Sequence, residues 1–217
     1  MIAKKSIVIL AFSALSLSSI YADTTSSKLM QSGTQKVVIV KDQDDLKADL
    51  AKLNSMIERD PILKDFKIQA MLTTDENKMP ELTLSGELDT DKQYEDVVTL
   101  SENIMDINNI NTDNLKVKDS ESSLSDLYIT GLLKGKIINN NIFNDKSVEY
   151  WGIDISTKNG VVYITGNVDN SNDIPRLEQL AKSINDVKNV KVDVKIVDQE
   201  KNDNATATDT DTDTDTE

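Results

Sequence analysis

A repeat at a fixed offset of 80 residues constrains the fold of this 217-residue chain more than any other feature. Residues 82–113 align on 162–193 without a gap, and most apolar positions stay apolar. Gly86 falls on Gly166, and Asp89 falls on Asp169. A chance match of apolar periods would not readily keep a glycine and a turn aspartate in register. The sequence therefore predicts two copies of one small domain.

The second copy shows the order of elements most clearly. Two stretches have apolar residues at helical spacing, and three alternate between apolar and polar residues as half-buried strands do. In chain order these stretches are the helix 124–140, the strands 153–156 and 162–168, the helix 172–185 and the strand 190–196. Asn159-Gly160 between the first two strands is typical of a two-residue hairpin turn, because both positions must accept a positive φ.

The first copy repeats this order. Its helices are predicted around 46–57 and 97–107, and its strands around 66–72, 82–88 and 115–117. One departure is clear: the longer polar loop from Asp75 to Pro80 replaces the Asn-Gly turn, so we expect a looser hairpin there.

The predicted fold class is α+β, with two tandem α-β-β-α-β units. Each unit forms a small three-stranded mixed sheet with two helices on one face and water on the other. The last strand should lie parallel to its neighbour through a right-handed crossover. We expect domain 1 at residues 42–118 and domain 2 at residues 119–200.

The two ends of the chain differ from the repeats. Residues 1–22 have the pattern of a secretory signal peptide: Lys4 and Lys5, an apolar core that is too short to span a membrane, and Ala22 at the cleavage site. A flexible leader, 23–41, contains the apolar run Lys36 to Val40, which either pairs with a sheet edge or packs as a lead-in. Residues 201–217 form an acidic Thr/Asp tail that we expect to be disordered. The mature protein is expected in the periplasm, without a transmembrane span.

Composition excludes several function classes. The net charge of -14 disfavours nucleic acid as a partner. The chain has no His and no Cys, which removes Cys nucleophiles, disulfides and the usual zinc sites. No catalytic residue, metal site or cofactor is predicted, although an enzyme that uses carboxylates remains a rival interpretation.

The second copy resembles the BON-domain family of bacterial envelope proteins, and the first copy resembles it more weakly. The residues that carry the resemblance are Asp126, Ile129, Ile153-Asp154-Ile155, Asn159-Gly160, Tyr163, Thr165-Gly166, Ala181 and Asp186-Val187. In the first copy, Ser101 replaces the small Ala181. The resemblance implies tandem domains, an envelope setting, no catalytic motif and a role at phospholipid surfaces or in envelope stress.

The candidate contact residues lie in domain 2. Tyr150 and Trp151 are an aromatic pair that could anchor at a lipid headgroup boundary, with Lys134, Lys136 and Lys146 near lipid phosphates. The alternative is that Trp151 closes the small core. Domain 2 holds 9 basic and 13 acidic side chains, net -4, whereas domain 1 holds 9 and 18, net -9.

Three glycines are assigned structural roles. Gly160 belongs to the predicted hairpin turn, and Gly86 and Gly166 are expected to accommodate packing or a bulge rather than a ligand.

These observations favour a non-enzymatic periplasmic binding or structural protein. It would support cell-envelope integrity or the osmotic or envelope stress response, with weak contact to an anionic phospholipid surface or an envelope protein. The alternative is a protein-interaction adaptor or chaperone-like factor whose sheet faces or strand edges hold a client.

Overall fold

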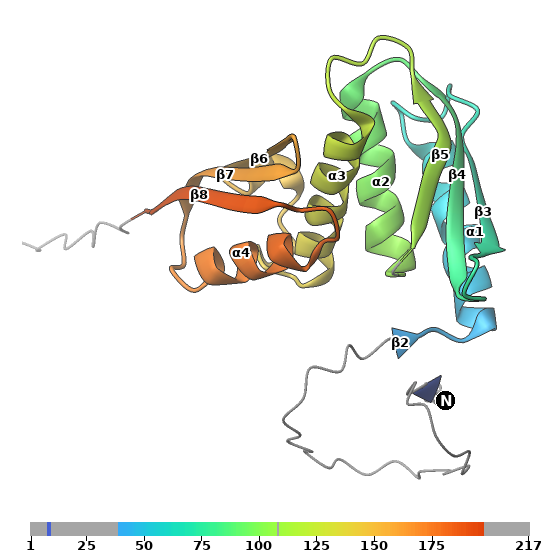
Figure 1. Ribbon diagram of the computed structural model, residues 1–217, viewed down its shortest axis with the longest axis horizontal. Helices are drawn as coiled ribbons and strands as arrows, with labels where there is room; N and C mark the ends of the chain where they lie inside the picture. Colours follow the sequence, from blue (N-terminus) through green and yellow to red (C-terminus); the bar gives the residue numbers. More distant parts are fainter. Residues whose placement is uncertain (1–7, 10–38, 108, 198–217) are drawn as a thin grey trace, which may run out of the picture.

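A computed structural model describes residues 8–9, 39–107 and 109–197. Within domain 1 the elements are α1 (Gln43–Arg59), β3 (Gln69–Thr74), β4 (Pro80–Leu88), α2 (Asp91–Met105) and β5 (Ile110–Val117). Within domain 2 they are α3 (Leu124–Asn139), the 3₁₀ turn η1 (Val148–Tyr150), β6 (Ile153–Lys158), β7 (Val161–Val168), α4 (Asp173–Ser183) and β8 (Asn189–Ile196). The predicted α-β-β-α-β order is confirmed in both copies (Figure 1).

Each domain has one three-stranded sheet. The strand orders are β3-β4-β5 and β6-β7-β8. In each sheet the first pair is antiparallel and the second pair is parallel, as the sequence predicts. The predicted acidic tail and most of the predicted signal peptide and leader lie outside the described residues. Among the described residues, β1 (Val8–Ile9) pairs antiparallel with β2 (Ile39–Val40).

The register of the parallel strands reproduces the repeat. Leu82 pairs with Ile110 in the first sheet, and Val162 pairs with Val190 in the second. The offset is therefore 80 residues in both strands at the start of each ladder.

A β-bulge then separates the two sheets. Thr83 pairs with Asn111, but Ser85 pairs with Asn114, so β5 holds one residue more than β4 over this stretch. Because a one-residue slip sends each later side chain to the other face, the bulge turns Leu115 into the core and leaves Asn114 exposed. The bulge lies where the ungapped alignment of the two copies ends.

Local chemistry begins the helices as the sequence requires. Thr90 starts α2 with a capping box, in which its hydroxyl accepts from Gln93 N–H and the Gln93 side chain accepts from the Thr90 N–H. Asp42 begins α1 by accepting from Asp44 N–H. The helices cover one face of each sheet and enclose the apolar core, which includes Leu53 and Leu133 at 0% exposure. None of the helices in the described part of the chain is both long and apolar enough to cross a membrane.

The hairpin turn of domain 2 is seated on a buried carboxylate. Asn159 and Gly160 both adopt positive φ, at 55° and 77°, as their turn requires. Asp126 in the first turn of α3 accepts from both of their N–H groups at 2.8 Å. In domain 1 the position 80 residues earlier is Leu46, which is buried, and no Asn-Gly turn is present. The carboxylate and the turn are therefore present together in domain 2 and absent together from domain 1.

We predict that Asp126→Ala lowers the free energy of unfolding by about 2–4 kcal/mol, because it strands two N–H donors that share a charged acceptor. Asp126→Asn keeps one acceptor oxygen and should cost clearly less. Urea denaturation of both variants measures the difference. Equal losses in the two variants would show that the hydrogen bonds to the turn do not carry the stability.

Candidate functional site

The predicted aromatic pair lies in a long loop between α3 and β6, and its two members differ in exposure. Trp151 is buried at 4% exposure, stacks on Phe143 with ring centroids 5.2 Å apart, and donates its Nε1–H to the Lys146 carbonyl at 2.9 Å. Tyr150 is 74% exposed. Trp151 thus belongs to the core of domain 2, and Tyr150 alone of the pair is offered to a partner.

Further exposed apolar side chains lie at the same end of domain 2 as Tyr150. The Gly152 carbonyl accepts from Asn167 N–H at the end of β7, and Val197 N–H donates to the Val168 carbonyl one residue later. The aromatic loop and the end of β8 therefore both attach to the end of β7. The exposed apolar side chains at this end are Tyr150, Ile196 at 49% and Val197 at 48%.

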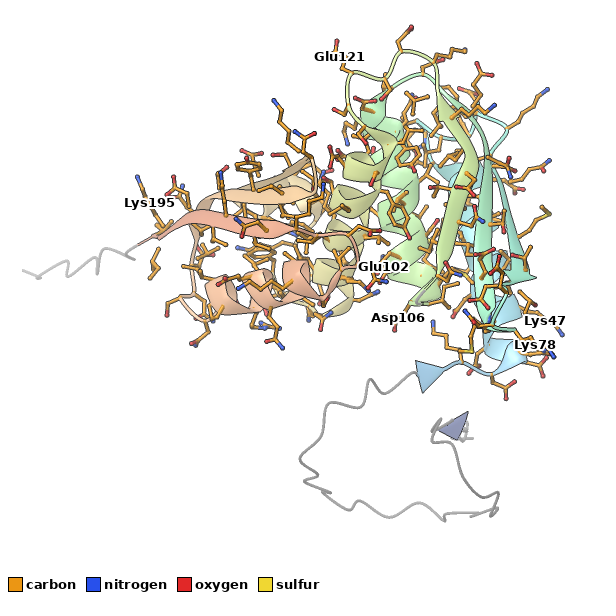
Figure 2. All side chains as sticks on the ribbon, in the orientation of Figure 1. Lys47, Lys78, Glu102, Asp106, Glu121 and Lys195 are labelled. Atoms are coloured by element: carbon orange, nitrogen blue, oxygen red, sulfur yellow. The ribbon has the colours of Figure 1, made fainter. Side chains whose placement is uncertain are left out.

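One of the predicted lysines, Lys146, shares this end with Lys195, which was not predicted; we give this end the name distal end. The distal end comprises Tyr150, Ile196, Val197, Lys146 and Lys195. Lys146 pairs with Asp169 at 3.0 Å, and both side chains are largely exposed. Figure 2 shows Lys195 at the extremity of domain 2 that points away from domain 1.

Lys134 and Lys136 lie elsewhere, which corrects the expectation that they would meet lipid phosphates. Their ammonium groups point toward α2 of domain 1, where Lys134 pairs with Glu95 at 2.6 Å and Lys136 with Glu102 at 2.7 Å. Each ammonium group already has a partly or fully buried carboxylate as its partner, so neither is available to a surface. The five predicted contact residues therefore do not form one patch.

The two lysines belong to an interdomain seam between α2 and α3, which lie side by side (Figure 1). Gly131 and Gly135 face α2 across this seam. A Cβ built on Gly131 would lie 2.8 Å from the Val98 Cβ, and one on Gly135 would lie 2.5 Å from the Glu102 Cβ. A real Cβ does not fit at such distances, so the two glycines permit the close approach of the helices. Gly131 faces Val98, and Gly135, four residues later, faces Glu102, which is four residues after Val98. Because the contacts advance along both helices together, the two helices run in the same direction.

Polar contacts fix the register of the seam. Thr99 donates its hydroxyl hydrogen to the Gly131 carbonyl at 3.2 Å, and the Asn139 side chain donates to the Glu102 carbonyl at 2.9 Å. Tyr128 of α3 donates to the Ile110 carbonyl of β5 at 3.0 Å. Burial raises the pKa of Tyr128 to about 12, so its phenol stays protonated and remains a donor.

Glu102 is the buried ionisable group of the seam. Glu102 is 1% exposed. Burial away from water raises the pKa of its carboxyl above the ordinary value of 4.5, although the Lys136 ammonium acts to lower it. Figure 2 shows Glu102 at the boundary between the domains. A crevice of about 390 Å³ opens beside it, lined by residues of both domains such as Ile107 and Ile184.

Sequence periodicity missed the seam, although a signal was present. Two glycines in a helix interior cost about 1 kcal/mol each relative to alanine, which requires a compensating reason. Their spacing of four residues places them on one face, the arrangement that lets helix backbones approach closely. The apolar residues of α3 also surround the helix instead of forming one stripe, as in a helix that is buried on two sides.

The glycines predicted to have structural roles in the strands, Gly86 and Gly166, lie in β4 and β7. Gly86 and Gly166 have φ of 143° and 121°. A Cβ on Gly166 would collide with the Gly152 carbonyl oxygen, so backbone approaches backbone at this point. Among the described residues, no group of three or more potential ligands is placed to hold a metal ion.

We predict that Gly135→Ala destabilises the protein despite the better helix propensity of alanine. The propensity gain is about 1 kcal/mol, whereas a methyl group forced against Glu102 and the Thr99 carbonyl costs about 1–3 kcal/mol or displaces the helices. Urea denaturation gives the stability, and small-angle scattering should show an increased radius of gyration. A gain in stability with unchanged dimensions would contradict the close packing.

Glu102 should give the protein a characteristic pH dependence. A carboxyl whose pKa is raised on folding binds more protons in the native state, so its contribution to stability falls as pH rises from about 4.5 through the raised pKa. The side chain in Glu102→Gln does not titrate, so this variant does not lose stability in this way. The unfolding free energy of the variant minus that of the wild type should therefore increase as the pH rises from about 4.5 through the raised pKa. In a Lys136→Gln background the increase should be larger, because the ammonium that favours the charged form is absent. A difference that stays constant from pH 4 to pH 8 would refute the assignment.

The sequence of this chain is similar to those of known proteins. Residues 130–198 match the BON domain family. The chain is 26% identical to "Osmotically-inducible protein Y" of Escherichia coli (strain K12) over 209 residues, which cover 89% of this chain and 96% of that protein.

Two solved structures of CdsD, a structural protein of the type III secretion system of Chlamydia trachomatis, also match. They are 18% and 19% identical, each match covers 70% of this chain, and the chain spans 66% and 63% of theirs. Their TM-scores of 0.27 are too low to support a conclusion. Residues 130–198 are therefore similar to the BON domain, and most of the chain is similar to Osmotically-inducible protein Y.

Proposed function

We propose that the chain is an exported, non-enzymatic protein of the bacterial periplasm that supports envelope integrity during osmotic or envelope stress. The distal end of domain 2 makes a weak contact with an anionic phospholipid surface. The observation that carries this proposal is the grouping of Tyr150, Ile196 and Val197, all exposed, at one end of a domain whose other large apolar side chains are mostly buried. The name of the relative supports the osmotic setting.

The chemistry of the distal end suits a membrane interface. A tyrosine presents an apolar ring and a polar hydroxyl, which favours the headgroup boundary. Lys146 and Lys195 supply positive charge beside it. Each Lys near an anionic surface contributes on the order of 1 kcal/mol, and salt weakens the attraction.

The charge distribution supports a contact through domain 2. Domain 1 carries a net charge of -9 and would be repelled by anionic lipid, whereas domain 2 carries -4. Since domain 2 is still acidic, attraction depends on the local lysines. The contact should therefore be weak and reversible.

The alternative is an adaptor or chaperone-like factor of the periplasm. The observation that favours it is the strand order of the two sheets, which leaves the outer edges of β3, β5, β6 and β8 without a partner strand among the described residues. Such edges can accept an extended client segment.

Vesicle flotation tests the membrane proposal. Protein expressed from the full chain is isolated from the envelope fraction, and its intact mass shows whether it begins at Asp23. It should float with vesicles that contain anionic lipid, less so with neutral vesicles, and less at high salt. Tyr150→Ser should reduce the bound fraction about threefold to tenfold, because it removes the largest apolar group of the distal end.

Matched variants separate the distal end from general effects. Ile62→Ser also removes an exposed apolar side chain, 51% exposed, but in domain 1, and it should leave flotation unchanged. Trp151→Ala should lower the unfolding free energy by about 3–5 kcal/mol as a core substitution. Equal losses of binding from Tyr150→Ser and Ile62→Ser would refute a contact through the distal end.

A further inference from the structure

Domain 1 has an open groove that is distinct from the distal end and from the seam. It runs between the N-terminal half of α1 and the strand β3, with a volume of about 570 Å³. Its lining is largely apolar and includes Leu46, Leu50, Ala70 and Leu72. Since β3 is the outer strand of its sheet, its free backbone edge borders the groove.

The repeat shows how domain 1 differs from domain 2 at this place. Leu46 and Leu50 correspond to Asp126 and Thr130 of domain 2. Those two polar residues tie α3 to the β6–β7 hairpin, because Asp126 holds the turn and the Thr130 hydroxyl bonds to that of Thr157 at 2.9 Å. Two leucines cannot form such bonds. The side-chain hydrogen bond recorded between α1 and β3 lies one turn beyond Leu50, where the Asn54 side chain donates to the Ala70 carbonyl at 3.4 Å.

The β3–β4 turn of domain 1 also bonds to itself instead of to α1. Its first residue, Asp75, accepts from the N–H groups of Asn77 and Met79 at 2.9 Å and 2.8 Å. The turn is therefore closed without covering the groove.

Positive charge marks one end of the groove. Lys47 of α1 and Lys78 of the turn both line it, and Figure 2 shows them near each other at the end of domain 1 where α1 begins. Lys47 lies 3.7 Å from Asp44, but both side chains are well exposed, and such pairs contribute little. In a domain of net charge -9, two lysines at one end of an apolar groove favour a negatively charged group at that point.

Handedness argues against the chain's own apolar run, Lys36 to Val40, as the occupant. That run enters α1 where β3 ends, so a strand formed by it along the free edge would lie parallel to β3. The helix α1 would then connect two parallel strands. Because β5 lies on the other side of β4 through a right-handed crossover, this connection would be left-handed, which is rare. In the structure Ile39–Val40 pairs instead with Val8–Ile9.

We propose that the groove between α1 and β3 binds a partner peptide, added as an extended strand to the edge of β3, with apolar side chains at alternate positions and a C-terminal carboxylate at Lys47 and Lys78. Leu50 and Leu72, which are both half-buried, receive the apolar side chains. The backbone of β3 supplies hydrogen bonds, as in other cases where a peptide extends a sheet. This inference does not depend on lipid binding by domain 2.

A synthetic peptide tests the proposal with the full chain. The probe is acetyl-Thr-Val-Thr-Val-Thr-Val with a free C-terminal carboxylate. Its affinity for the protein is measured by isothermal titration calorimetry. Binding should protect the amides of residues 69–74 from hydrogen exchange. The same peptide methylated at alternate backbone nitrogens should bind at least about tenfold more weakly, because it cannot complete the ladder.

Charge-reversal variants test the end of the groove. Lys47→Glu combined with Lys78→Glu should weaken binding of the free-acid peptide about threefold to tenfold and should have little effect on the C-terminally amidated peptide. Lys52→Glu combined with Lys64→Glu changes the net charge equally but lies outside the groove lining, and it should leave both affinities unchanged. Equal effects of the two double variants would overturn the assignment of the carboxylate.

Two further results would overturn the proposal as a whole. One is binding without protection of residues 69–74, which would place the peptide elsewhere. The other is a higher peptide affinity in Ile39→Asp, which would show that the chain's own apolar run already occupies the groove.

Discussion

The close approach of α2 and α3 is the constraint on which the two-domain structure depends. A unit of about 75 residues is near the lower size limit for a stable core, because it buries a small share of its surface. Gly131 and Gly135 remove the side chains that would hold the two helices apart. As a result α3 lies against its own sheet on one side and against domain 1 on the other, and nine of its sixteen residues are buried. The two units thereby act as one larger body.

The same seam explains the distribution of charge. Domain 1 has the larger excess of acidic side chains, and part of that charge is balanced by Lys134 and Lys136 from domain 2. Burying Glu102 is costly because its carboxylate loses water, but the seam supplies an ammonium partner. The lysines that sequence proximity assigned to a membrane surface are instead part of the internal electrostatics of the chain.

Much of the fold could be predicted because it depends on periodic patterns. Alternating residues such as Val162 and Ile164, and helical stripes such as Leu177 and Ala181, face the core as expected. The seam could not be found in this way, since a helix that is buried on two sides has no single apolar stripe. The burial of Trp151 could be stated only as an alternative, because exposure depends on how a loop folds over the core. The groove of domain 1 arises from polar contacts that are missing, and a missing contact leaves no periodic signal.

The bulge in β5 bears on how the two repeats could diverge after a gene duplication. Inserting one codon into a strand would normally direct each following side chain to the opposite surface and ruin the domain. Here β5 takes up the surplus residue between Asn111 and Asn114, opposite the stretch from Thr83 to Ser85 of β4, and Leu115 still reaches the interior. A frame-preserving insertion at this point is therefore tolerated, and residues downstream of it have their counterparts 79 positions later, not 80: Leu115 matches Val194, since Gly86 and Gly166 pair with them in turn.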